Sequence, residues 1–158
     1  MFGASRTGAV YTRSMLETVS LIGLLVMIAG LAGLAYTGNL ISSNPVAIAL
    51  ELPGVWLIVW ARLVFGSRSF HATANPTKGG LVTTGPYHYI RHPIYTGGCV
   101  IACGAVIAHV SMLSVGCWTL VLAGGVVRML CEERLLMAAY PEYAQYTRST
   151  KRMIPFIF

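Results

Sequence analysis

Four long apolar runs restrict what this chain can fold into more than any other feature of its sequence. They cover roughly residues 16–36, 46–65, 94–110 and 112–130, and a helix needs about 20 mostly apolar residues to cross a bilayer. Hydrophobic residues make up 56% of the chain and charged residues 10%, whereas soluble domains carry about 25% charged residues. The sequence therefore predicts an all-α integral membrane protein with about four transmembrane helices, forming a single domain over residues 1–158.

The distribution of basic residues indicates how these helices are oriented. All 11 Lys and Arg residues lie on or next to one side of the expected arrangement, which holds the amino terminus, the loop over residues 66–92 and the carboxyl tail. Because cytosolic segments are enriched in Lys and Arg, we expect both termini and this loop in the cytosol. This distribution explains the net charge of +6, so a nucleic-acid partner is not expected.

Two further features of the apolar runs have plain structural interpretations. Glu51 lies only a turn or two inside the second run, and we expect its carboxylate to reach back to the membrane interface. The cysteines lie in or beside apolar runs without a spacing typical of a metal site, so we expect small buried thiols. They are Cys99, Cys103, Cys117 and Cys131.

The most polar and aromatic stretch of the chain lies at the mouth of the third apolar run. Residues 85–95 read GPYHYIRHPIY, a costly set of side chains to place at a membrane boundary unless something binds there. Aromatic and basic residues also collect at interfaces simply as anchors, and that alternative stays open for this stretch alone. Pro93 lacks an N–H and biases His92 away from helical geometry, so the loop is expected to end at this step.

A second polar group lies where the fourth run ends. Arg128 and Glu132 are four residues apart and therefore share a helix face, whereas Glu133 points elsewhere. An ordinary surface ion pair is the plain alternative. The short break between the third and fourth runs predicts a tight helical hairpin, which would bring this pair beside His92 and Tyr95.

Several motifs, taken together, resemble a known family. They are GGLVTTGPY over residues 79–87, RHPIY over 91–95, Arg128 with Glu132 and Glu133, Tyr143 with Tyr146, and IPFI over 154–157. Their order and spacing resemble the isoprenylcysteine carboxyl methyltransferases and their prokaryotic relatives, a group related to the phospholipid methyltransferases. The resemblance covers roughly the last half of the chain, with the catalytic and cofactor region over residues 71–158.

This resemblance implies S-adenosylmethionine as the cofactor. The family's cofactor positions are matched here by Gly79, Gly80, Leu81, Val82, Tyr87, His92, Pro93, Ile94, Tyr95 and Glu132. Arg128 matches the catalytic, substrate-facing arginine, and Ala72 replaces a polar cofactor contact of some relatives. The resemblance also implies that the long loop and the tail close over the cofactor on the cytosolic side, while an amphiphilic or prenylated substrate enters from the membrane lipid.

The chemistry of the methyl acceptor separates two hypotheses. A carboxylate whose ordinary pKa is about 4 is ionised at neutral pH and needs only an orienting cation, a role that suits the guanidinium fork of Arg128. An amine, as in phosphatidylethanolamine, must first lose a proton, and Glu133 or His88 would be the base. The carboxylate is the preferred hypothesis.

Two hypotheses of other classes remain. A haem- or metal-binding membrane protein would use His88 with His92, or His109, but Pro93 breaks any helix that displays the first pair and no ligand set is completed. A non-catalytic scaffold would need only the small residues for helix packing, and not Arg128, Glu132 and His92 together. A soluble nucleotide-binding fold is excluded, since no phosphate-binding glycine motif occurs.

Overall fold

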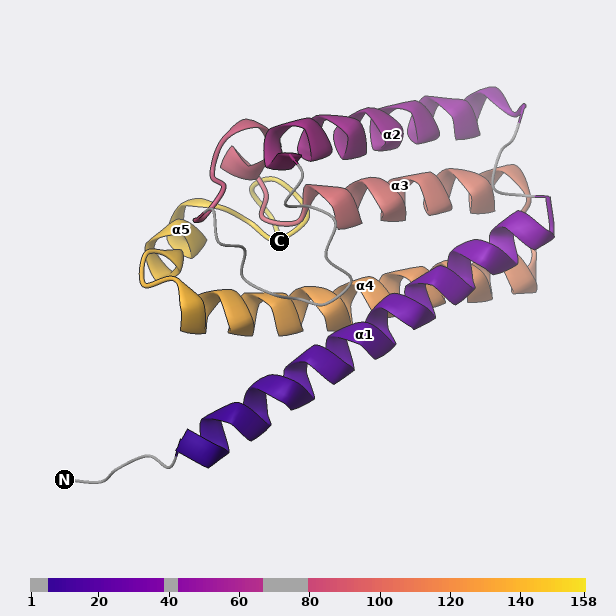
Figure 1. Cartoon of the computed structure of the whole chain (residues 1–158). Helices are drawn as coiled ribbons and strands as arrows, with labels where there is room; N and C mark the ends of the chain where they lie inside the picture. The colour runs from indigo at the N-terminus through magenta and orange to yellow at the C-terminus, as the bar shows by residue number, and fades with distance from the viewer. Residues whose placement is uncertain (1–5, 39–42, 67–79) are drawn as a thin grey trace.

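The computed structural model describes residues 6–38, 43–66 and 80–158. Within these ranges, side chains are described from residue 13 onward. Its elements are α1 (Arg6–Tyr36), α2 (Pro45–Phe65), the 3₁₀ helix η2 (Gly85–His88), α3 (Pro93–Ala108), α4 (Met112–Ala139) and α5 (Tyr143–Ser149). The described residues form helices and connecting segments, as Figure 1 shows. The prediction of an all-α membrane protein is confirmed.

Three helices are long and apolar enough to cross a membrane, and a fourth apolar helix is shorter. The three are residues 13–36 of α1, all of α2 and all of α4. The third run was expected to span the bilayer, but α3 has only 16 residues and rises about 24 Å, less than the about 30 Å of a hydrocarbon core. The expected breakpoints are confirmed, since α2 begins at Pro45 and α3 begins at Pro93.

The helices pack in two pairs, α1 with α4 and α2 with α3, and the short α3–α4 hairpin joins the pairs. The pairing of α1 with α4 depends on glycine. A Cβ atom added at Gly30 would lie 2.5 Å from the Cys117 carbonyl oxygen, and one at Gly124 would collide with the Gly23 carbonyl and lie 2.7 Å from Met27 N. Small residues let the two backbones touch, which is how membrane helices gain packing without a hydrophobic driving force.

Glycine also brings α2 and α3 together, and it places Glu51 differently from the expectation. A Cβ at Gly97 would lie 2.6 Å from the Gly54 carbonyl oxygen, and one at Gly104 would lie 2.9 Å from Glu51 Cγ. Glu51 therefore lies against α3, and its Oε1 atom is buried without a hydrogen-bond partner among the described residues. The expectation that its carboxylate reaches the interface is wrong for this oxygen, because the close helix contact covers it.

Replacing Gly124 by leucine should separate α1 from α4. We expect a loss of at least about 3 kcal/mol in the free energy of unfolding, since the clash falls on backbone atoms that cannot rotate away. Gly116→Leu on the same helix is the matched control, because a Cβ there meets nothing within 4 Å. Unfolding by SDS titration, followed by circular dichroism, measures both variants. Equal stability of the two would contradict the close α1–α4 packing.

Candidate functional site

The site lies at the end of the bundle where α3 begins, α4 ends and the carboxyl tail crosses back (Figure 1). The tail pairs with the polar stretch in parallel, through a bridge between Ile90 and Lys151. Arg91 N donates to Lys151 O at 2.8 Å, and His92 N donates to Arg152 O at 2.9 Å. Segments about 60 residues apart are thereby held as one surface.

The centre of the site is a contact between Arg128, Tyr95 and Glu132. The Tyr95 hydroxyl accepts from Arg128 Nε at 2.6 Å and donates to Glu132 Oε1 at 2.5 Å. Arg128 Nε also lies 3.1 Å from the same carboxylate oxygen. The two α4 residues share a helix face as the sequence indicated, and the hairpin adds Tyr95 from α3. The arginine is buried, so this is not the ordinary surface ion pair that was the alternative.

His92 lies between two carboxylates. Its Nδ1 is 3.7 Å from Glu132 Oε2, its Nε2 is 3.5 Å from Glu133 Oε1, and its side chain is 5% exposed. The ring stacks on Tyr95, with 5.6 Å between ring centroids. Nε2 has no hydrogen-bond partner among the described residues. A buried ring nitrogen without such a partner retains the capacity to bind a ligand atom.

Glu133 was a candidate base for an amine acceptor, but its contacts with two arginines were not foreseen. Its Oε1 accepts from Arg91 Nε at 2.8 Å, and its Oε2 accepts from Arg152 Nε at 2.9 Å. Although Glu133 lies off the face of Arg128, it is buried and joins α4 to both the polar stretch and the tail. The adjacent pair of glutamates in an apolar chain was the available signal, but the sequence did not show that Arg91 and Arg152 are its partners.

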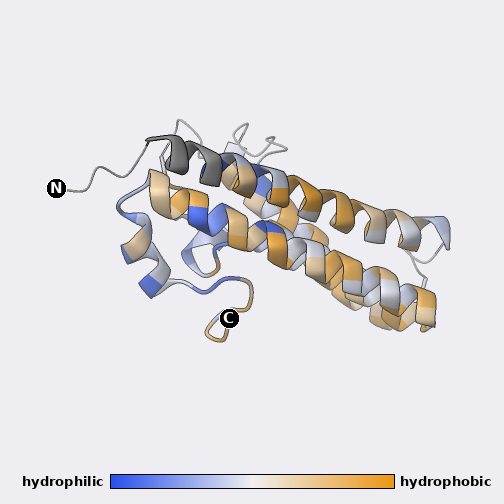
Figure 2. Cartoon of the chain, turned by 90° about the horizontal axis from the view of Figure 1, so that it is seen from below, coloured by the Kyte–Doolittle hydropathy of each residue, from blue (hydrophilic) through white to orange (hydrophobic). Residues whose placement is uncertain are grey.

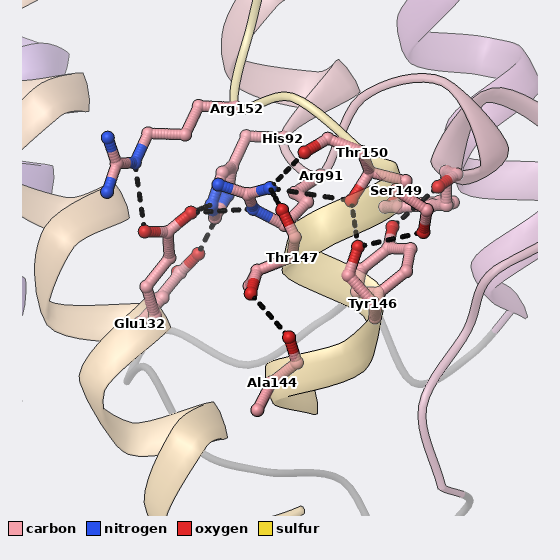
Figure 3. Close-up of polar contacts among 11 residues, drawn as sticks. Arg91, His92, Glu132, Ala144, Tyr146, Thr147, Ser149, Thr150 and Arg152 are labelled. Carbon is pink, nitrogen blue, oxygen red and sulfur yellow. Dashed lines mark hydrogen bonds and ion pairs between the residues drawn. The ribbon is translucent and has the colours of Figure 1, made fainter. Parts of the chain in front are cut away.

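Arg91 fastens α5 to the same network. Its Nη1 donates to the Thr147 carbonyl at 3.3 Å and also to the Thr150 carbonyl. Figure 3 shows Arg91 pointing toward these two residues and Arg152 approaching from the tail. A short helix of seven residues is thus held by a guanidinium whose side chain is 8% exposed, in addition to the few hydrogen bonds that so short a helix makes itself.

Tyr87 is held from two sides. Its carbonyl oxygen accepts from the Tyr146 hydroxyl at 2.5 Å, and its ring lies 5.5 Å from that of Phe65, between centroids. Burial raises the pKa of Tyr146 to about 12 and also raises the pKa of Tyr87. Both phenols are therefore neutral at physiological pH and serve as aromatic and hydrogen-bonding groups, not as anions.

Comparison with known proteins identifies the chain at the level of a family. The model of the family described as "Phospholipid methyltransferase" matches residues 43–143. The chain belongs to this family. The match covers most of the described helices and both groups of site residues, and the family includes methyltransferases of the isoprenylcysteine carboxyl type. The resemblance seen in the sequence is confirmed at this level.

One curated relative adds context. The chain is 30% identical over 118 residues to the cobalt-zinc-cadmium resistance protein CzcN of Cupriavidus metallidurans, covering 71% of this chain and 50% of that protein. The chain therefore spans about half the length of this relative. No solved structure matches. The name of CzcN concerns metal resistance, but among the described residues of this chain no three His, Cys, Asp or Glu side chains are grouped to hold a metal ion.

The structure brings together only some of the family's expected site residues. His92, Tyr95, Arg128 and Glu132 contact one another directly, whereas Pro93 and Ile94 contribute the first turn of α3 beside them. Gly80, Leu81 and Val82 lie just before η2, with Gly80 at a left-handed φ of +77°. Among the described residues these three make no side-chain bond to the central group. Gly79 and Ala72 fall outside the described residues.

Two other histidines that the structure describes, His88 and His109, lie away from this centre. His88 is exposed, with its ring edge against Tyr89. His109 caps α3 at the opposite end of the bundle. Neither contacts His92 within the part of the chain that the structure describes, so the paired ligation required by the haem hypothesis has no geometric support there. The four cysteines are free thiols, and Cys117 and Cys131 are buried, whereas Cys99 and Cys103 are only partly so.

Proposed function

We propose that the protein transfers a methyl group from S-adenosylmethionine to the polar end of a membrane lipid or prenylated amphiphile. The observation that carries this proposal is the contact of the buried Arg128 with Tyr95 and Glu132 beside His92. It sets an anion, a cation and an aromatic hydroxyl within one site at the end of apolar helices. Membership of the phospholipid methyltransferase family supports the same reaction class.

The charges of the site fit the proposed cofactor. Glu132 supplies the anion for an ammonium group. His92 is a candidate partner for a carboxylate, since its buried Nε2 lies 3.5 Å from Glu133 Oε1 and makes no hydrogen bond among the described residues. The Tyr95 and His92 rings, stacked in parallel, offer aromatic faces near a cation. When bound, the cofactor supplies an electrophilic methyl group. The residues of the chain then have to hold the acceptor in line and exclude water.

The ion pairs favour a carboxylate acceptor over an amine. Glu133 was the candidate base for an amine, but both its oxygens already accept from arginines at 2.8 and 2.9 Å. Proton uptake by this carboxylate would break a buried network. Three arginines, Arg91, Arg128 and Arg152, face two glutamates, so the cluster favours an anionic ligand. We therefore propose O-methylation of a carboxylate, as in the isoprenylcysteine type, with Arg128 orienting the acceptor.

The competing proposal is N-methylation of an ethanolamine headgroup. The name of the matching family favours it. It requires another base, and His88 is an exposed candidate on the loop side of the site. Assays with the two acceptor types distinguish the two proposals.

The location of the site in the membrane is also a proposal. Arg128, Arg152 and the exposed Arg134, Arg148 and Lys151 lie at the end of the bundle that holds the site. By the positive-inside rule this end faces the cytosol, and both termini with it.

Calorimetric titration with S-adenosylhomocysteine tests the cofactor half of the proposal. We expect the wild-type protein in detergent to bind, and Glu132→Gln to weaken binding at least about tenfold, because a charge-assisted contact is lost. Glu142→Gln, at an exposed glutamate in the turn after α4, is the matched control and should bind as the wild type does. No binding by folded wild-type protein, or full binding by Glu132→Gln, would refute the assignment.

A further inference from the structure

The carboxyl-terminal tip, defined here as residues 154–158, exposes large apolar side chains after a basic tail. The exposed fraction is 88% for Phe156 and 76% for Ile157. Backbone hydrogen bonds close the tip on itself, with Met153 N donating to Phe158 O at 2.7 Å. The tip is therefore a folded turn that points Phe156 and Ile157 away from the protein.

Phe156 is held outward in an unfavourable backbone conformation. Its φ is +66°, and among the described non-glycine residues it alone has a positive φ. A bulky side chain seldom occupies this left-handed region, where glycine or asparagine is usual. The described part of the protein covers little of this side chain, which is 88% exposed. This apolar side chain can therefore contact a partner outside the protein.

The place of the tip favours lipid as the partner. The carbonyl oxygen of Met153 accepts from Thr96 Oγ1 at 2.9 Å, so the tip begins beside the first turn of α3. This helix has only 16 residues, and its neighbours α2 and α4 are long enough to span. A short apolar helix leaves part of the bilayer thickness unmatched. The tip adds apolar side chains at that end, and Figure 2 shows it, marked C, as an apolar loop beside the helices.

The charges next to the tip suit a membrane surface. Arg148 and Lys151 are exposed, and the Arg152 guanidinium lies 5.4 Å from the centroid of the Phe158 ring. Basic residues beside an apolar turn are typical of segments that dip into the headgroup region. A second copy of the chain is a poorer partner, because five residues supply far less than the about 800 Å² per side of a stable protein interface.

We infer that residues 154–158 insert into the interfacial region of the phospholipid bilayer and anchor the tail there. The anchored tail is the one whose Lys151 and Arg152 carbonyls accept from Arg91 N and His92 N. Lipid insertion of the tip therefore holds the backbone of the site. This inference concerns the placement of the tail and does not depend on methyl transfer.

Photo-crosslinking tests the inference on the full chain in nanodiscs of phosphatidylcholine and phosphatidylglycerol. The photoreactive residue p-benzoylphenylalanine replaces Phe156 in one variant and Ile157 in another. If one of these variants does not fold, the other still provides the test. Leu52→p-benzoylphenylalanine, at a residue of α2 that is 64% exposed, is the lipid-facing control. Glu142→p-benzoylphenylalanine, in the exposed turn at the same end, is the water-facing control. Mass spectrometry identifies the adducts.

The expected result is lipid adducts at position 156 or 157 with at least half the yield found at Leu52, and less than a tenth of that yield at Glu142. Adducts within the chain or to a second copy, or a yield at both tip positions no higher than at Glu142, would overturn the inference. The cofactor titration is unaffected by this result, so the two proposals fail independently.

Discussion

Glu133→Gln should lower the free energy of unfolding by about 3 kcal/mol or more, because it leaves two arginines facing each other without their shared anion. Both guanidinium groups lie within 2.9 Å of this carboxylate, whose side chain is 7% exposed. The change keeps the size and shape of the side chain, so the loss reports charge and not packing. SDS unfolding followed by circular dichroism measures it.

The matched control is Glu17→Gln, which breaks the exposed pair with Arg13 one turn away on α1. Exposed pairs of this kind contribute about 0.3–0.5 kcal/mol, so this variant should unfold nearly as the wild type does. The double variant Glu133→Gln with Arg152→Ala should lose less than the sum of the two single changes, since the partners share one network. Equal, small losses at Glu133 and Glu17 would show that the buried network does not stabilise the tail.

Arg128→Lys should lower kcat/KM for methyl transfer about 100-fold while the affinity for S-adenosylhomocysteine changes less than about threefold. Lysine retains the positive charge, but it loses the planar fork that fixes a carboxylate in two directions, and misplacement of a reactant by about 1 Å costs about 100-fold. Initial rates with tritiated S-adenosylmethionine and N-acetyl-S-farnesylcysteine, a prenylated carboxylate, measure the effect.

Arg134→Lys serves as the control, since Arg134 is exposed on the same helix. It should retain the wild-type rate. If Arg128→Lys lost cofactor affinity and rate together, Arg128 would belong to the cofactor site. If Arg128→Lys and Arg134→Lys both kept full activity, Arg128 would have no role in orienting the acceptor.

Much of this architecture follows from local sequence. A helix in a bilayer must form hydrogen bonds between its own backbone groups and must be long enough to cross the bilayer. The apolar runs, the start of α3 at Pro93 and the hairpin before Met112 are all of this kind. The shared face of Arg128 and Glu132 needed only the helical period. The hairpin placed His92 and Tyr95 beside this pair, whereas the cofactor roles of the site residues came from the family resemblance.

What the sequence did not reveal depends on contacts between distant segments. The partners of Glu133 come from the loop and from the tail, 42 and 19 residues away, and no helical period connects them. The burial of Glu51 Oε1 depends on how closely Gly104 lets α2 approach α3. Docking of the segments, and not local preference, decides each of these.

Transfer of tritiated methyl groups by the wild-type protein in nanodiscs tests the central claim most directly. N-acetyl-S-farnesylcysteine is compared with phosphatidylethanolamine as acceptor, and Arg128→Lys and Glu132→Gln are run beside the wild type. The account predicts label in a base-labile methyl ester of the prenylated carboxylate, with loss of label in both variants. Label in the ethanolamine headgroup alone would contradict the carboxylate assignment. No transfer to either acceptor by protein that binds S-adenosylhomocysteine would contradict the proposed acceptor class.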